Sequence, residues 1–264
     1  MSFKIQTFEA YEFNRELPSG RTKPCVVTCS GAGHETSEHV VKLKSAVNFN
    51  ETGLTCELVS ALLAKKLGLC VPDPSLILIS TEFAESISVP HISSVMKASI
   101  GLNFGSALVT GGSSTWPVDK PLTLLLEEKA SEIVAFDAMI QNPDRRTDKP
   151  NVLSKSQEIY IIDHEMAFSF LHTIGSAHPQ PYTPEAFSWF LRRHLFYGYF
   201  RGKDLKLDRF IAAIRLTSED DIAQIFDTIP NAWKNDATPK IRAHLLKILK
   251  EPSKFIDSVR RVIV

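Results

Sequence analysis

The pattern of apolar and polar positions changes along the chain and separates a β-rich beginning from a helical remainder. In the first hundred residues, short apolar or alternating runs are separated by glycine and proline turns, which is typical of strands. One longer segment, residues 50–69, repeats leucine at helical spacing and predicts a helix. This part therefore predicts a small antiparallel sheet with one helix, and we expect its strands within residues 3–13, 23–30, 39–45, 71–80 and 87–99.

A stretch rich in glycine and serine follows, over residues 100–118, and we interpret it as a connector. Beyond it the apolar positions mostly recur at helical spacing. Helices are predicted at about 122–140, 184–200, 204–214, 218–228 and 237–262. The expected fold class is α+β with two lobes: residues 1–100 form a β-rich N-lobe with one helix, 101–119 a connector, and 120–264 a mostly helical C-lobe.

The polar loop QNPDRRTDKPN interrupts this helical part and carries Asp144 and Asn151. Two short apolar strands follow the loop, and the second of them ends at Asp163. Because two strands joined as a hairpin are rigid, we expect the three side chains to lie at one end of a fixed support. Metal-assisted phosphoryl transfer uses this set: one carboxylate orients the attacking hydroxyl, and an amide and a second carboxylate hold magnesium.

Composition argues against some classes of partner, although balanced charges do not exclude a local basic patch. The 264 residues include 30 basic and 30 acidic side chains, so no overall field favours nucleic acid, and we expect no direct nucleic-acid binding. No run approaches the roughly 18 apolar residues of a membrane span. The first residues lack the apolar segment of a signal peptide, so we expect a cytoplasmic protein. The cysteines, Cys25, Cys29, Cys56 and Cys70, have no metal-site spacing, and we expect buried reduced thiols.

Three features of the first hundred residues are of the kind that bind nucleotides, although each is common elsewhere. The loop GAGHETSE contains Gly31 and Gly33, whose backbone N–H groups can lie over phosphates, but most such loops only turn the chain. Lys42 follows two valines and can point into a cleft, but a lysine in a strand is more often a solvated edge residue. Glu57 lies in the predicted helix and either pairs with Lys42 or faces solvent.

The order of these parts resembles the HipA-like kinases, in particular a short single-module branch with an NPDR-type catalytic loop. The resemblance covers most of the chain. It rests on HVVKLK, the helix and strand ELVSALLAKKLGLCVPDP, LNFGS, NPDRRTDKPNVL, IYIIDHEMAF and the late IPNAW. Related motifs occur in phosphatidylinositol kinases, which share the fold. The resemblance implies a protein-kinase-like fold that binds ATP and Mg²⁺.

For the nucleotide, the resemblance implies that Lys42 contacts the ATP phosphates and that Glu57 holds this lysine in place. The adenine would lie in the cleft between the lobes, near Met96, Lys97 and Ala98.

For the chemistry, the resemblance implies that Asp144 is the catalytic aspartate. Arg145 would orient the loop or neutralise phosphate charge. Asp163 would bind the metal together with Asn151. Kinase loops usually place this asparagine at the fifth position after the catalytic aspartate, where this chain has Lys149.

The lysine at this position leaves two possibilities for the metal. Either Asn151 is the ligand, with the loop extended by two residues, or metal binding is weakened; Asp148 is a further candidate ligand. Glu165 also stands where similar proteins often have glycine.

The sequence therefore predicts an ATP- and magnesium-dependent kinase, and the resemblance implies a serine or threonine of a protein substrate as the acceptor. One alternative is a lipid or small-molecule kinase of the phosphatidylinositol-kinase type. Another is a pseudokinase, a non-catalytic module that binds ATP or a partner. The resemblance also implies a toxin–antitoxin pair, with an antitoxin-like protein as partner.

Overall fold

The computed structural model describes residues 3–18, 22–117, 121–173 and 178–263. Its strands are β1 (Gln6–Glu16), β2 (Cys25–Ser30), β3 (Thr36–Lys42), β4 (Pro74–Ile79), β5 (Gly101–Ala107), β6 (Ser114–Thr115), β7 (Val152–Lys155) and β8 (Glu158–Ile161). Its α-helices are α1 (Glu51–Lys66), α2 (Thr81–Ser86), α3 (Pro90–Lys97), α4 (Leu124–Met139), α5 (Ser188–Leu191), α6 (Tyr197–Phe200), α7 (Asp208–Arg215), α8 (Glu219–Asp227), α9 (Ala237–Lys250) and α10 (Pro252–Ile263). Short 3₁₀ helices are η1 (Ser169–His172), η2 (Pro184–Ala186) and η3 (Asn231–Trp233).

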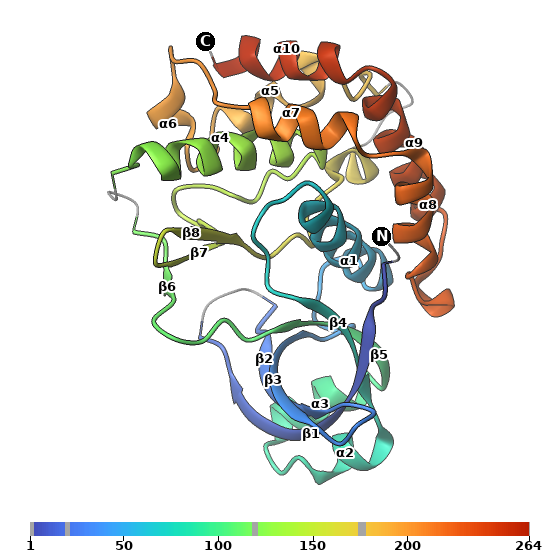
Figure 1. Ribbon diagram of the computed structural model, residues 1–264. Helices are drawn as coiled ribbons and strands as arrows, with labels where there is room; N and C mark the ends of the chain where they lie inside the picture. The colour runs from blue at the N-terminus through green and yellow to red at the C-terminus, as the bar shows by residue number, and fades with distance from the viewer. Residues whose placement is uncertain (1–2, 19–21, 118–120, 174–177, 264) are drawn as a thin grey trace.

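The N-terminal strands close into a barrel in the order β1-β2-β3-β5-β4 (Figure 1). The pairs are antiparallel except for β1 and β4, which run parallel with Gln6 opposite Ser75. Strand β1 has two register shifts against β2, and such bulges let a long strand bend around a closed sheet. Val27, Val41 and Ile77 fill the interior. The expected antiparallel sheet is therefore a barrel closed by one parallel pair.

Residues 87–99 were expected to form a strand, and this prediction is wrong, because they contain helix α3, preceded by α2. The β-branched Ile87, Val89 and Ile92 favoured a strand. However, Pro90 occupies the first turn of α3, where its fixed φ and missing N–H suit a helix. Ser80 caps α2 by accepting from the N–H of Phe83. The described part of residues 1–100 thus contains α1, α2 and α3 rather than one helix.

The start of the expected connector belongs to the barrel, because Gly101–Ala107 is the strand between β3 and β4. Gly105 allows close packing there: a Cβ at this position would lie 2.4 Å from Cγ1 of Ile77. Glycine in this stretch thus marks a close approach of strands as well as a turn. The end of the expected connector, residues 118–119, lies outside the described residues.

Helices α1 and α4 are apolar on nearly all sides, and such helices are buried between layers. Helix α1 packs against β4 and β5 on one side and against α8, α9 and η3 on the other (Figure 1). Lys66 Nζ lies 2.6 Å from Oδ1 of Asp221, which joins α1 to α8. Residues Leu54 and Leu58 of α1 share one core cluster with Ile133 of α4, so the barrel and the helical part meet over a continuous apolar core.

The C-terminal helices are shorter than the sequence predicts. The segment expected as one helix over 184–200 is broken into η2, α5 and α6. Within it, Leu195 N donates to the carbonyl of Arg145, and His194 forms a β-bridge with Arg146. Pairing with the polar loop therefore overrides the helical periodicity. The expected helix 237–262 is two helices, because Pro252 begins a new one. No helix in the described ranges is long and apolar enough to cross a membrane.

Cys25, Cys29 and Cys56 are buried, and none of the chain's cysteines is in a disulfide. Burial raises the pKa of Cys25 and of Cys29 to about 12, so both thiols are protonated at neutral pH. The expectation of buried reduced thiols therefore holds for Cys25, Cys29 and Cys56, whereas the Cys70 thiol is half-buried and donates to Glu158 Oε2 at 3.0 Å.

His244 fixes α9 on α4. Its Nε2 lies 2.8 Å from the carbonyl oxygen of Met139, and its ring stacks on Phe170 with centroids 4.7 Å apart. Burial lowers the pKa of His244 to about 4. An unfolded histidine titrates near 6.5, so between these values the unfolded chain binds a proton that the folded chain does not.

We therefore expect this residue to lower the stability of the protein as the pH falls. Its contribution to the free energy of unfolding is retained above pH 6.5 and declines by about 2 kcal/mol between pH 7 and pH 5. Urea unfolding at both pH values measures the loss. In His244→Gln the amide can still donate to the carbonyl of Met139, but the side chain does not titrate. The loss of stability between pH 7 and pH 5 should therefore be smaller in this variant by about 2 kcal/mol. An equal loss in the variant and the unaltered protein would contradict the role of His244.

Candidate active site

Arg145 holds the polar loop in place, and its side chain is completely buried. Its Nε lies 2.5 Å and its Nη2 3.2 Å from the two carboxylate oxygens of Asp137 on α4. Nη1 donates to the carbonyl oxygens of Asn151 and Ile162. The guanidinium thus ties α4, the loop and the end of β8 together. These contacts hold the loop in place, and the completely buried Arg145 side chain has no exposed surface that a phosphate could reach.

Asp137 is the counter-charge for this arrangement and also contacts His194, whose Nε2 is 2.9 Å from Oδ2. Burial alone would raise the pKa of Asp137, but Arg145 and His194 lower it to about 2. The Asp137 carboxylate is therefore ionised, and its partners are two side chains of this protein, Arg145 and His194. The sequence signal for this buried pair is the single aspartate in the apolar helix segment EIVAFDAM.

The structure brings Asp144 and Asn151 together although seven positions separate them. Asn151 Nδ2 donates to the backbone carbonyl of Asp144 at 3.0 Å and lies 3.3 Å from its Oδ2. Asn151 has φ 48°, a left-handed conformation that asparagine tolerates better than most residues. The loop turns there into β7. The Asp144 backbone N–H is held by Asn142 Oδ1 at 3.1 Å.

A second group of charges joins the barrel to the hairpin. Lys42 Nζ, from β3, lies 2.5 Å from Asp163 Oδ1 and 3.3 Å from Glu57 Oε1. The other oxygen of Glu57 accepts the backbone N–H of His164 at 2.9 Å. Burial would lower the pKa of Lys42, but the carboxylates of Asp163, Glu57 and Glu165 raise it above its usual value. Lys42 is therefore a charged, buried lysine directed at Asp163.

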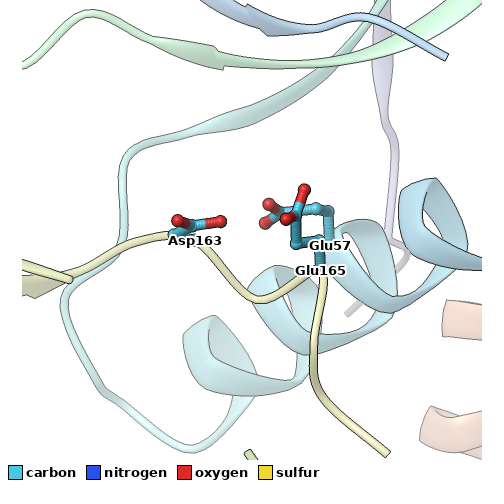
Figure 2. A group of neighbouring side chains, drawn as sticks. All are labelled: Glu57, Asp163 and Glu165. Atoms are coloured by element: carbon cyan, nitrogen blue, oxygen red, sulfur yellow. The ribbon is translucent and has the colours of Figure 1, made fainter. Parts of the chain in front are cut away.

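Glu165 adds a third carboxylate, and Figure 2 shows it together with Glu57 and Asp163. One oxygen of each lies within 4.8 Å of the others. Asn48 Nδ2 donates to Glu165 Oε1 at 2.6 Å, and Glu165 Oε2 is 3.9 Å from Lys42 Nζ. Burial first, and then the charges of Asp163 and Glu57, raise the pKa of Glu165 to about 7 against the opposing effect of Lys42. Sequence reasoning noted Glu165 only as a departure and missed Asn48, for which the pattern has no signal.

These residues fit a hard divalent cation. Carboxylate and amide oxygens are the ligands that magnesium prefers. Glu57 Oε1 and Glu165 Oε2 are buried oxygens without a hydrogen-bond partner, and the charge that lies close to them is the Lys42 ammonium, at 3.3 Å and 3.9 Å. The carboxylates that lie close enough together to hold such an ion are those of Glu57, Asp163 and Glu165.

Lys149 lies between the two aspartates. Its Nζ is 2.5 Å from Asp144 Oδ2 and 3.2 Å from Asp163 Oδ2. Asp148, by contrast, is exposed and pairs with Arg146 through two contacts of 2.9 Å. Of the two residues that the sequence left open as metal ligands, Asn151 contacts Asp144, whereas the exposed Asp148 pairs with Arg146.

The other residues expected at the nucleotide are placed differently. Gly31 and Gly33 lie in the turn between β2 and β3, where the Glu35 carboxylate lies so close that a Cβ at Gly31 would meet it at 2.0 Å. Met96 is completely buried in the barrel core, while Lys97 and Ala98 are exposed at the end of α3. Figure 1 shows α3 beyond the barrel from the hairpin β7–β8. Met96 shares a core cluster with Val41 and Leu43, the neighbours of Lys42, and Ser99 Oγ, just after Ala98, accepts from the backbone N–H of Ser45 at 3.1 Å.

Comparison with solved structures shows which fold the chain has. Over 98% of its length the chain is similar to the crystal structure of a Helicobacter pylori proinflammatory kinase, CtkA, of which it covers 98%, with a TM-score of 0.55 and 14% sequence identity. It is also similar to the crystal structure of the Golgi casein kinase with Mn/ADP bound, with a TM-score of 0.49, 10% identity and coverage of 96% and 73%. The first likeness shows a kinase fold.

The family follows from the sequence. The profile of the HipA-like kinases matches residues 11–252, and the chain belongs to this family. No curated protein sequence matches it.

Proposed function

We propose that this protein is an ATP- and magnesium-dependent kinase that transfers the γ-phosphoryl group of ATP to a serine or threonine hydroxyl of a protein. The observation that carries the proposal is the convergence of two sets of side chains. Lys42 and Glu57 form one set, and Asp144, Asn151 and Asp163 the other. Lys42 connects them through its 2.5 Å contact with Asp163. Membership of the HipA-like kinases supports a phosphotransferase.

Each residue of the site has a role that follows from its chemistry. Lys42, held by Glu57, places a positive charge where the phosphates bind and stabilises the charge that develops on transfer. Asp144 orients the acceptor hydroxyl and accepts its proton. Asp163, Asn151 and Glu165 would hold the magnesium, which supplies positive charge to the β- and γ-phosphates when bound. Arg145 acts through the loop, since it holds the segment that carries Asp144 and Asn151.

A non-catalytic, ATP-binding role is the second candidate. Lys149 favours it, because its ammonium occupies the space between Asp144 and Asp163. In that case nucleotide would bind without turnover. The antitoxin-like partner stays a prediction of the family resemblance.

The test is transfer of labelled phosphate from ATP by the purified protein with magnesium, with and without a cell lysate, followed by phosphoamino-acid analysis. We expect label on serine or threonine. Lys42→Met should lower transfer by about 10²–10³-fold, as expected for the loss of one group that stabilises the transition state. Lys44→Met, the same change just beyond β3, is the matched control and should keep transfer.

Other outcomes separate the alternatives. Label on added phosphatidylinositol vesicles but not on protein would indicate a lipid kinase. ATP binding without transfer under any condition would establish the non-catalytic role. A protein that binds no ATP would refute both.

A further inference from the structure

Lys149 lies between Asp144 and Asp163, and its single ammonium contacts both carboxylates. Its Nζ is 2.5 Å from Asp144 Oδ2 and 3.2 Å from Asp163 Oδ2. The Lys149 ammonium, a cation supplied by the chain itself, therefore holds the carboxylates of Asp144 and Asp163 together.

Kinases of this fold commonly use two magnesium ions, held by the metal-binding aspartate and by an amide of the catalytic loop. Magnesium requires oxygen ligands at about 2.0–2.1 Å in nearly octahedral geometry. Lys149 occupies the loop position of that amide and is in contact with Asp163 Oδ2, so an ion bound by this oxygen would have to displace the ammonium. Adding a second cation beside a fixed positive charge is also electrostatically unfavourable.

The two lysines divide the oxygens of Asp163 between them. Lys42 contacts Oδ1, and Lys149 contacts Oδ2. Lys42 has a second carboxylate partner in Glu57, at 3.3 Å, so it can turn toward phosphates without losing its counter-charge. Oδ1 then becomes free for a metal ion, while Oδ2 remains with Lys149. The arrangement leaves room for one ion at Asp163.

We propose that Lys149 replaces one of the two metal ions, so that this protein binds a single divalent cation with each nucleotide. The inference rests on the proposed function, because it concerns the metal that accompanies ATP. It assigns a role to the position at which the chain departs from the usual kinase loop: Lys149 is a built-in cation that positions Asp144 against Asp163.

The test counts bound Mn²⁺ by electron paramagnetic resonance, with the purified protein saturated by a non-hydrolysable ATP analogue. We expect one Mn²⁺ per protein. Lys149→Asn removes the charge and supplies an amide ligand, so this variant should bind two. Lys155→Asn removes the same charge at the far end of β7 and should still bind one. Circular dichroism and thermal unfolding check that the variants fold.

The unaltered protein decides the question even if the Lys149 variant does not fold. Two Mn²⁺ per nucleotide in the unaltered protein would overturn the role of Lys149 and leave the kinase proposal standing. One Mn²⁺ in both the unaltered protein and a folded Lys149→Asn would also overturn it, because the lysine would then not be what excludes the second ion. Failure to bind the nucleotide analogue at all would refute the proposed function, and this inference with it.

Discussion

Replacing Asp144 with asparagine should lower the rate of phosphoryl transfer by about 10²–10⁴-fold, the usual contribution of a positioned general base. Asparagine has nearly the same shape as aspartate but cannot accept the proton of the acceptor hydroxyl. The loop should keep its conformation, because Asn151 donates to the backbone carbonyl of Asp144 as well as lying near its side chain. Single-turnover transfer measures the rate, and calorimetric titration with an ATP analogue should show that nucleotide affinity is retained.

The matched control for this change is Asp148→Asn in the same loop. The Asp148 side chain is exposed and pairs with Arg146, so its loss should leave transfer nearly unchanged. An equal loss of activity in both variants would mean that loop charge, and not a proton acceptor at Asp144, limits the reaction. Full activity in Asp144→Asn would remove Asp144 from the mechanism.

Replacing Arg145 with methionine should destabilise the fold strongly, because it leaves the Asp137 carboxylate buried without its main counter-charge. Breaking a buried ion pair in this way costs about 3–5 kcal/mol. For a chain of this size that corresponds to a fall in the melting temperature of roughly 6–20 °C. Thermal unfolding followed by circular dichroism measures the change at neutral pH.

Two further variants separate positioning from chemistry. Arg146→Met removes the neighbouring, partly exposed arginine and should change stability by less than about 1 kcal/mol. The double variant Arg145→Met with Asp137→Leu removes both buried charges and should recover part of the lost stability. If Arg145→Met instead has the same melting temperature as the unaltered protein and has lost only its activity, Arg145 acts in the chemistry. The positioning role would then be wrong.

The sequence predicted those elements whose local pattern agrees with their tertiary surroundings. Val41, directly before Lys42, and the leucines around Glu57 are buried as their periodicity indicates. The hairpin that ends at Asp163 follows from two short apolar runs separated by a polar turn. In these segments local propensity and core packing favour the same structure.

The predictions fail where contacts with residues distant in the sequence determine the local structure. Residues 87–99 alternate like a strand, but the capping residue Ser80 and Pro90 set helices that cover the barrel. The segment around His194 is helical in its spacing but pairs with the loop at Arg146.

In the site, Arg145 was expected to act on substrate or loop. Only its contact with Asp137, eight positions earlier, shows that it is part of the core. Such contacts leave no periodic trace in a sequence.

The burial of α1 limits how the activity of this protein can be switched. Glu57 lies on α1, and many kinases are turned off by an outward swing of the corresponding helix, which separates the lysine from the glutamate. Here such a swing would expose Leu54, Leu58 and Leu62 to water, at about 1.5–3 kcal/mol each. It would also break the contact between Lys66 and Asp221.

Together these losses would confine the swung-out state to about one molecule in 10³ or fewer. We therefore expect Lys42 and Glu57 to stay paired in both the active and the inactive state. Control of turnover would then have to act on the loop that carries Asp144, or on access of substrates to that loop.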